Sequence, residues 1–378
     1  MSAEPADRLA RVALSAISEP GDPRLAALAA EIGATALHRH LVDERDLAGL
    51  HTDLASRLAA FDPERVLADA ARQGVRFVTP ADAEWPTQLD DLAEVPPIQE
   101  RGGAPLGLWV RGPMRLDQLA DAVAVVGSRS ATTYGADVAA EIAAEVGSTG
   151  RCIVSGAAFG IDQAAHRGSI AAGGPTVAVL ACGADRVYPS AHRQLLDHIA
   201  AEGAVVSETA PGGAPTRIRF LSRNRLIAAL TQGTVVVEAA MRSGALNTAN
   251  WASRLNRVLL GVPGPVSSAP SQGVHQLIRT GAATLVTSGA EVLEAVGTAG
   301  EHLLELPRGR ELPRDRLSPR QRQVLDAVPV ARGARADSIA RAAGVGLVEV
   351  GSALIKLEEK GLVEVDDGGW RLAARAHT

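Results

Sequence analysis

The sequence predicts an α/β protein built on a doubly wound parallel sheet. Two observations predict it. Between about residues 120 and 297, short runs rich in Val and Ile alternate with helix-length amphipathic segments. These runs are apolar throughout rather than at every second position, which is typical of parallel strands covered by helices on both faces. Ligands of such sheets bind beyond the carboxyl ends of the strands, so the loops that follow the runs are the first places to look for a site.

The region before the sheet divides into two parts. Residues 1–75 are rich in Ala and Leu and are broken at EPGDP (19–23) and GA (33–34), so we expect a small helical N-terminal domain. Residues 76–118 contain six prolines and short apolar runs such as LGLWVRG. They indicate an irregular connector with short strands, which we group with the sheet in one domain, 76–297.

The sheet domain is predicted to hold six strands and five intervening helices. The expected strands are 122–127, 152–156, 176–183, 204–208, 234–239 and 258–264. The expected helices are 134–146, 161–172, 191–202, 222–231 and 245–255.

The last part of the chain predicts a separate module. Residues 298–318 are polar and punctuated by Pro and Gly, which indicates a linker. In 319–378, three helical segments precede two short strands joined through a Gly-Gly turn. This order is typical of a winged helix-turn-helix domain.

Composition excludes several classes of protein. No apolar run in the 378 residues reaches the roughly 18 residues of a membrane span, and the first 16 residues lack the features of a signal peptide. We therefore expect a cytoplasmic protein. Cys152 and Cys182 each lie in an apolar run, so we expect two buried thiols. We expect neither a metal site nor a cofactor.

The charge is unevenly distributed along the chain. The net charge is −5, and residues 1–120 carry 12 Arg and Lys against 19 Asp and Glu. Residues 121–300 and 301–378 each carry 13 basic against 12 acidic residues. Net charge therefore neither supports nor excludes a nucleic-acid partner. Evidence for such a partner must come from a local basic patch.

The loop after the first predicted strand, GSRSATTYG (127–135), has the residues of an anion site. Gly127 permits a tight turn, Ser128 offers a hydroxyl, and the next helix begins with unpaired N–H groups. Arg129 would add a guanidinium suited to phosphate, although a solvated or salt-bridged loop arginine is the alternative. The loop matches neither the G-x-G-x-x-G dinucleotide fingerprint nor a P-loop.

The loop after the second predicted strand, SGAAFGIDQAAH (155–166), begins with Ser155 and Gly156, which we count among the site residues. Asp162 is placed to cap the next helix, and His166 follows at i+4. A functional Asp–His pair is conceivable, but a structural cap and a helix-face histidine are the alternative. Glu238, at the end of the fifth strand, is expected to orient a nearby arginine, with a catalytic carboxylate as the alternative.

The segment RIRFLSRNR (217–225) gathers four arginines around one phenylalanine. We expect Arg217 and Arg219 to share one side of an extended segment, and a helix to begin near Ser222. Phe220 would stack on a base, which is worth about 1–3 kcal/mol and tolerates any sequence.

Three more polar residues would lie in the first helical turn beside free N–H donors: Arg223, Asn224 and Arg225. Cations there oppose the helix dipole, which an anion would relieve. Structural ion pairs to Glu208 or Glu238 are the alternative.

These motifs together resemble the DprA/Smf family of DNA-processing proteins. The likeness covers about residues 80–290 and includes VAVVGSRSATTYG, SGAAFGIDQAAH, VAVLACGADRVYP, FLSRNRLIAALTQGTVVVEAA and GVPGP. It implies an extended Rossmann-like domain that binds single-stranded DNA, forms a homodimer and helps to load RecA in natural transformation or recombination. It implies no catalytic activity.

The family's contacts carry over by position onto Gly127, Ser128, Arg129, Arg217, Phe220, Arg223, Asn224 and Arg225. Two positions depart from the usual pattern. Leu221 stands where the family usually has Pro, and Arg217 where it usually has Lys.

Two other functions remain open from the sequence. QGTVVVEAA loosely resembles a loop of nucleoside-monophosphate phosphoribohydrolases, which would make Glu238 catalytic, although Gly-Gly-x-Gly is absent. The C-terminal module could instead read duplex DNA as a transcription factor. Its expected recognition helix carries Glu349, Glu358 and Glu359 against two lysines, which suits phosphate poorly and favours protein contact.

Overall fold

The structure is a computed structural model that describes residues 5–43, 58, 61–304 and 313–377. The chain forms two compact units, Met1–Leu304 and Glu305–Thr378, which are described separately. The predicted linker 298–318 lies partly outside the described residues, as do stretches of the predicted N-terminal domain at 1–4, 44–57 and 59–60.

The first unit is organised around a nine-stranded sheet in the order β1-β2-β6-β5-β4-β3-β7-β8-β9. The strands are β1 Val75–Val78, β2 Leu108–Arg111, β3 Val123–Val126, β4 Ile153–Ser155, β5 Thr176–Leu180, β6 Ala204–Ser207, β7 Gly233–Val236, β8 Val258–Gly261 and β9 Thr284–Leu285. All pairings from β6 to β9 are parallel. The six predicted strands are present, each shorter at its carboxyl end than expected.

Two strands of the predicted connector join the same sheet. β2 pairs antiparallel with β6, and β1 pairs antiparallel with β2. The sheet is therefore mixed, with an antiparallel edge on a parallel body. Trp109 and Phe77, whose ring centroids lie 4.6 Å apart, are buried there and explain why this proline-rich stretch folds onto the sheet.

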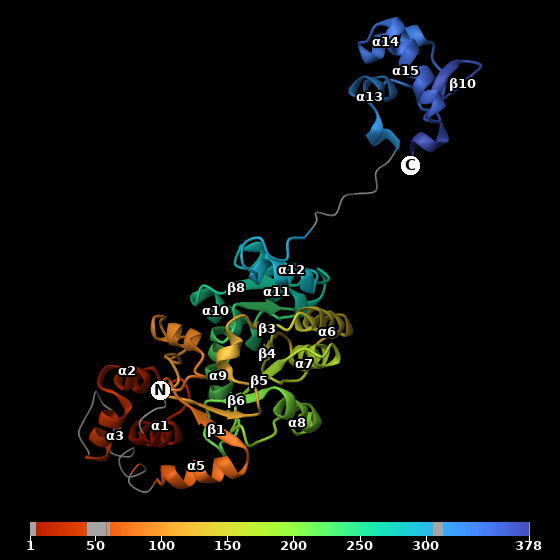
Figure 1. The fold of residues 1–378 in the computed structure, drawn as a ribbon. Helices are drawn as coiled ribbons and strands as arrows, with labels where there is room; N and C mark the ends of the chain where they lie inside the picture. Colours follow the sequence, from red (N-terminus) through yellow and green to blue (C-terminus); the bar gives the residue numbers. More distant parts are fainter. Residues whose placement is uncertain (1–4, 44–57, 59–60, 305–312, 378) are drawn as a thin grey trace. The chain divides into compact units, whose positions relative to one another are not determined.

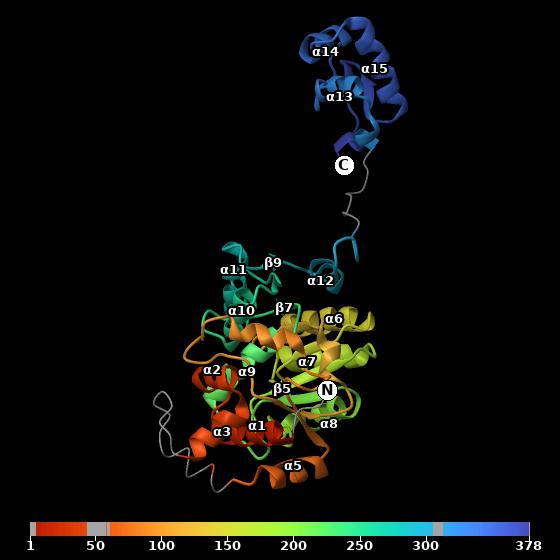
Figure 2. The ribbon, with the colours of Figure 1, turned by 60° about the vertical axis from the view of Figure 1, so that its left-hand side comes forward.

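Helices cover both faces of the sheet, as Figures 1 and 2 show from two directions. The helices that follow β3 are α6 Thr133–Ser148, α7 Ile161–Ala171, α8 Arg193–Glu202, α9 Arg217–Ala229, α10 Gly244–Arg254, α11 Gln272–Arg279 and α12 Gly289–Val296. Helices α6, α7, α8 and α12 pack on one face and α9, α10 and α11 on the other, because neighbouring residues of each strand point to opposite sides. Both faces are apolar, so the strand sequences are apolar throughout.

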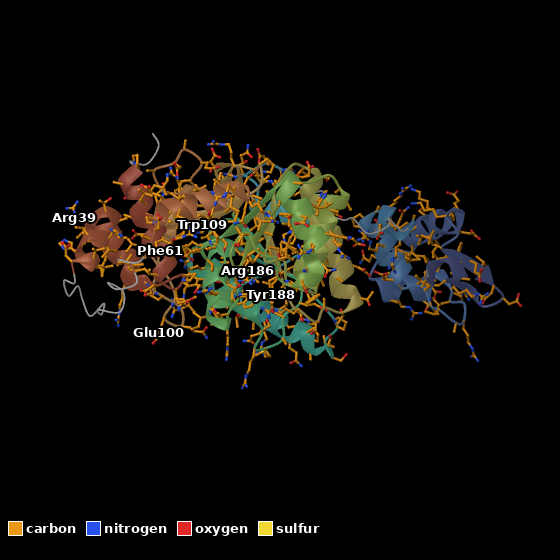
Figure 3. The ribbon with its side chains drawn as sticks, turned by 90° about the horizontal axis from the view of Figure 1, so that it is seen from below. Arg39, Phe61, Glu100, Trp109, Arg186 and Tyr188 are labelled. Atoms are coloured by element: carbon orange, nitrogen blue, oxygen red, sulfur yellow. The ribbon has the colours of Figure 1, made fainter. Side chains whose placement is uncertain are left out.

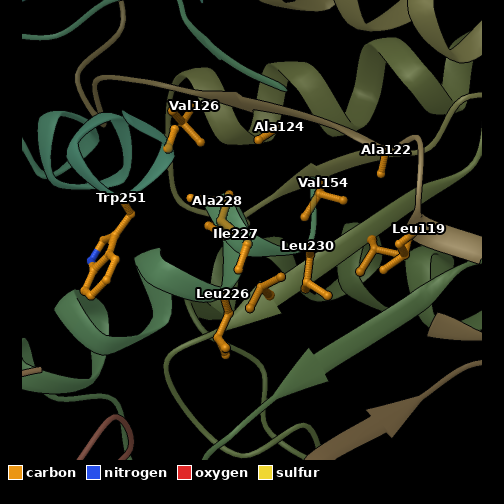
Figure 4. Packing of buried hydrophobic residues seen from close by; sticks show 14 of the residues in the cluster. Leu119, Ala122, Ala124, Val126, Val154, Leu226, Ile227, Ala228, Leu230 and Trp251 are labelled. Atoms are coloured by element: carbon orange, nitrogen blue, oxygen red, sulfur yellow. The ribbon is translucent and has the colours of Figure 1, made fainter. Parts of the chain in front are cut away.

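The half of α9 after its arginines packs tightly on the sheet. Leu226, Ile227 and Leu230 lie against Val154 and the neighbouring strands, with Trp251 of α10 beside them (Figure 4). This apolar contact fixes the position of the polar residues one turn earlier in α9.

Strand β3 lies between β4 and β7, so the chain reverses its winding direction there. The loops after β3 and β7 consequently meet at the carboxyl edge of the sheet. Such a reversal is where open α/β sheets bind ligands.

The N-terminal helices are α1 Pro5–Ile17, α2 Pro23–Ile32, α3 Ala34–Val42 and α5 Pro63–Arg72. They belong to the same compact unit as the sheet. Asp22 accepts hydrogen bonds from the N–H groups of Arg24 and Leu25, which starts α2 directly after the predicted break. Arg8 ties α1 to the sheet edge through the carbonyl of Phe77 and the carboxylate of Asp82.

The second unit contains three helices followed by a hairpin. Its elements are α13 Pro319–Asp326, α14 Ala336–Ala343, α15 Leu347–Glu359, β10 Val363–Asp366 and β11 Gly369–Leu372. Ser318 and Gln321 form a capping box at the start of α13, and Gly344 ends α14 in the left-handed conformation. In the described part of the chain, no single helix is long and apolar enough to cross a membrane. Among the described helices, the bent pair α14 and α15 together has the length and apolar composition of a membrane span. Both helices contribute residues to the core of this unit.

Candidate nucleic-acid interface

The loop after β3 is held by Glu238, from the loop after β7. The carboxylate of Glu238 accepts hydrogen bonds from the N–H (2.9 Å) and hydroxyl (2.6 Å) of Thr132, and its carbonyl accepts one from the N–H of Ser128 (2.7 Å). Thr132 in turn caps α6 by accepting from the N–H of Gly135. The prediction of an anion site with unpaired N–H groups in this loop is therefore wrong in part. The buried carboxylate of Glu238 already lies where an anion would bind.

The prediction that Glu238 orients an arginine of 223–225 is also wrong. Its carboxylate bonds Thr132, and Gly135 allows this approach, since a Cβ there would lie 2.3 Å from Glu238 Cδ. Glu238 is 1% exposed. Its hydrogen bonds to Thr132 and Ser128 hold the loop that contains Arg129.

Arg129 and Phe220 form a cation–π pair at this edge of the sheet. Arg129 is exposed, and its Cζ lies 4.5 Å from the centroid of the half-buried Phe220 ring. Two exposed aromatic residues come from the neighbouring loops, Phe159 after β4 and Tyr188 after β5. The Tyr188 ring lies 5.9 Å from that of Phe220, and Figure 3 shows Tyr188 near Arg186 in the first unit. The edge thus combines guanidinium groups with exposed rings.

Helix α9 begins five residues earlier than predicted. Thr216 accepts a hydrogen bond from the N–H of Arg219 and so starts the helix at Arg217. Residues two apart in a helix differ by roughly 200° in direction, so Arg217 and Arg219 do not share one side. Arg217 is exposed, whereas Arg219 forms two hydrogen bonds with the carboxylate of Glu19, of 2.9 and 2.8 Å.

Arg223 lies in the interior rather than in an exposed first turn. It is 7% exposed, and its Nη1 donates to the carbonyls of Gly156 (2.8 Å) and Val179 (2.7 Å). Gly156 is needed for this contact, since a Cβ there would lie 1.7 Å from Nη1. Burial lowers the pKa of Arg223, an effect opposed by the charge of Asp162. Arg223 therefore joins the ends of β4 and β5.

Asn224 and Arg225 are buried as well. The amide of Asn224 donates to the carbonyl of Gly244 and to Asn247, which attaches α9 to α10. Arg225 is 0% exposed and forms a 2.7 Å salt bridge with Glu208, the structural alternative that the sequence left open. The predicted exposed cluster at 223–225 is wrong because these residues lie within α9 rather than at its first turn, and Arg223 is one turn before Leu226 and Ile227, which pack on the sheet.

The loop after β4 is also internally bonded. The hydroxyl of Ser155 donates to the carbonyl of Val125, so it is buried between β3 and β4. Asp162 accepts a bond from the N–H of Ala158, and burial raises its pKa while Arg223 opposes that rise. His166 contacts the Thr176 hydroxyl through Nδ1 (2.7 Å). No hydrogen bond joins Asp162 to His166, so the functional pair is not supported. The predicted cap is wrong as well, because Gly160 is the N-cap of α7 and Asp162 lies buried within its first turn.

Sequence reasoning brought Gly127, Ser128, Arg129, Ser155, Gly156 and Phe220 to the same edge, but it missed Phe159 and Tyr188. Both residues were present in the quoted loop motifs. Their position was the available signal: each is an aromatic residue in a loop that follows a buried parallel strand, and these loops meet at one edge of the sheet.

Known proteins with similar sequences and folds support this description. The family model for DNA recombination-mediator protein A matches residues 76–297. A putative DNA processing protein DprA of Mycobacterium tuberculosis is 44% identical over 369 residues, which is 95% of this chain and 92% of that protein.

Two solved structures share the fold. The X-ray structure of DNA processing protein A from Streptococcus pneumoniae has a TM-score of 0.62 and 32% identity, covering 78% of this chain and 98% of that one. DNA processing protein A from Helicobacter pylori, described with a single-stranded DNA binding mode, has a TM-score of 0.51 and 24% identity, covering 59% and 96%. Since the family model spans more than half of the chain, the protein belongs to the DNA recombination-mediator protein A family.

Proposed function

We propose that this protein binds single-stranded DNA at the carboxyl edge of its sheet and acts as a recombination mediator. The observation that carries the proposal is the Arg129–Phe220 pair, a guanidinium lying over an aromatic ring at the switch point of the sheet. Proteins that bind single strands combine cations for the backbone with rings for the bases. Membership of the DNA recombination-mediator protein A family supports the role as a recombination mediator.

The exposed residues contact the DNA in this proposal, and the buried ones hold the loops. Arg129 and Arg217 bind phosphates, and Phe220 lies against a base. The two loops that border the bound DNA strand are shaped by four small residues: Gly127, Ser128, Ser155 and Gly156. Arg219 reaches a phosphate after leaving Glu19. The remaining site residues position α9 and its neighbours: Arg223, Asn224 and Arg225.

Membership of the family supports a wider role in recombination. The protein, as a homodimer, protects exposed or incoming single strands and helps RecA to load on them in homologous recombination or natural transformation. The helices and hairpin of the second unit form a winged helix-turn-helix domain that contacts protein rather than duplex DNA. Faster RecA filament assembly on coated single strands in the presence of the protein, and a dimer mass in sedimentation, would support these steps.

Mobility-shift assays with single- and double-stranded oligonucleotides over a salt series test the binding step. We expect tighter binding to single strands with little sequence preference. If about 4–6 phosphates are contacted, the logarithm of the affinity should fall with log salt with a slope near −0.7 per phosphate. Equal affinity for duplex, or a flat salt response, contradicts the proposal.

The protein acts without catalysis in this account, and the phosphoribohydrolase alternative is disfavoured by the hydrogen bonds that occupy Glu238. Purified protein should release no base from nucleoside monophosphates and should not shorten single-stranded DNA. Product formation that disappears in Glu238→Gln would support the alternative instead.

A further inference from the structure

Of the two aromatic residues in the Arg129–Phe220–Tyr188 group, Tyr188 is the more exposed to solvent. Tyr188 lies in the loop after β5, and the residue is 44% exposed. No hydrogen bond of its hydroxyl is found within the described residues. The Phe220 ring, by contrast, is half-buried and covered by the Arg129 guanidinium at 4.5 Å. Without DNA, the ring that is ready to receive a base is therefore that of Tyr188.

The two rings cannot share one base between them. Their centroids lie 5.9 Å apart, and their planes are inclined by 55°. This is the geometry of two aromatic rings in direct tilted contact. A base that stacks on one ring therefore does not stack on the other. At Phe220 the layer above the ring is Arg129, and a planar guanidinium can itself stack against a base.

We propose that Tyr188 forms a second base-stacking subsite, next to the one at Arg129 and Phe220, and that the two together hold neighbouring bases of one strand. This inference rests on the proposed binding of single-stranded DNA. The ligand class is any nucleobase with a free face, since stacking tolerates every base. Bases within a duplex are already stacked, so the subsite also favours single strands.

The surroundings of Tyr188 suit a nucleic-acid backbone. Arg186, two residues earlier in the same loop, is exposed, and its Nη1 donates to the carbonyl of Gly212 (2.6 Å). Within the described residues this is the one hydrogen bond of the Arg186 side chain, so its other donors stay available for a phosphate. Tyr134 makes a useful comparison: it is 41% exposed, but its hydroxyl donates to the carbonyl of Pro263.

The test is a set of oligonucleotides with one abasic position moved along the strand, bound by the wild type and by Tyr188→Ala. In the wild type, an abasic position at the subsite should weaken binding about 5- to 140-fold, the stacking range of about 1–3 kcal/mol at 1.4 kcal/mol per tenfold. Tyr188→Ala should bind intact DNA more weakly than the wild type does, by the same factor. An abasic position at the subsite should then cause no additional loss of affinity in this variant. Tyr188→Phe should behave as the wild type, and Tyr134→Ala should keep the wild-type abasic profile.

The outcomes separate this inference from the proposed function. If the wild type does not prefer single strands, the proposed function fails. If it does, but Tyr188→Ala keeps the full abasic profile, the second subsite alone is overturned. Tyr188→Trp provides a second measurement if the alanine variant does not fold. Quenching of the added tryptophan on DNA binding supports stacking, and unchanged emission at saturation contradicts it.

Discussion

Arg225 carries a charge in the interior of the first unit. Its Nη2 bonds Glu208, which also accepts a hydrogen bond from the N–H of Gly21, so one ion pair connects α9, the loop after β6 and the N-terminal helices. Removing one partner of a buried ion pair leaves the other charge without compensation, which is more costly than never having buried either.

Arg225→Ala should therefore lower the free energy of unfolding by about 3–5 kcal/mol. Arg217→Ala is the matched control, because it removes an exposed arginine from the same helix and should change stability little. Urea denaturation of both variants gives the comparison. Equal stability of the two would contradict the structural role of Arg225.

His166 makes stability depend on pH. Burial, with the charges of His192 and Arg223, lowers its pKa to about 3. The unfolded chain, in which histidine titrates near pH 6.5, binds one more proton between these values. Stability from this group is complete above about pH 6.5 and is lost as the pH falls toward 3, by about 1.4 kcal/mol per pH unit.

His166→Asn should consequently lose about 2 kcal/mol less stability than the wild type between pH 7 and pH 5. Denaturant midpoints at the two pH values measure this difference. The exposed His198→Asn is the control and should follow the wild type. If His166→Asn keeps the wild-type acid sensitivity, another group is responsible.

Helix α9 shows why the sequence located the candidate site but misplaced some of its residues. Hydrophobic periodicity in LIAALT placed the end of the helix well, since Leu226, Ile227 and Leu230 pack on the sheet. Its start was set by one side chain, Thr216, whose capping bond extends the helix to Arg217. Arg223 and Arg225 consequently lie in the buried middle of the helix rather than in its first turn. Their partners are carbonyls and a carboxylate on distant segments, which no local pattern specifies.

The Glu19–Arg219 ion pair joins the N-terminal helices to α9 and places a carboxylate where a phosphate would bind. Glu19→Gln should free Arg219, so that single-stranded DNA binds more tightly and the salt slope steepens by about 0.7. Glu31→Gln is the matched control, because it removes an exposed charge from the same region without freeing a cation. The two variants should differ in mobility-shift assays. Identical affinity and slope would remove Arg219 from the interface.

At the scale of the whole molecule, the parallel body of the sheet was predictable because its strands are buried on both faces and its helices are amphipathic. The order of the strands was not, since β2 reaches β6 across about a hundred residues of chain. The carboxyl edge was predictable as the candidate site, because the loops after parallel strands meet there. The division between exposed contacts and buried supports required the three-dimensional packing of α9.

The central claim is that exposed cations and rings at this edge hold a single strand. The most direct measurement is the salt dependence of single-stranded DNA binding by the wild type, Arg129→Ala and Phe220→Ala. We expect Arg129→Ala to weaken binding and to make the slope shallower by about 0.7, because one phosphate contact is lost. Phe220→Ala should weaken binding at an unchanged slope, because a stacked base releases no counterions. Wild-type affinity and slope in both variants would contradict the account.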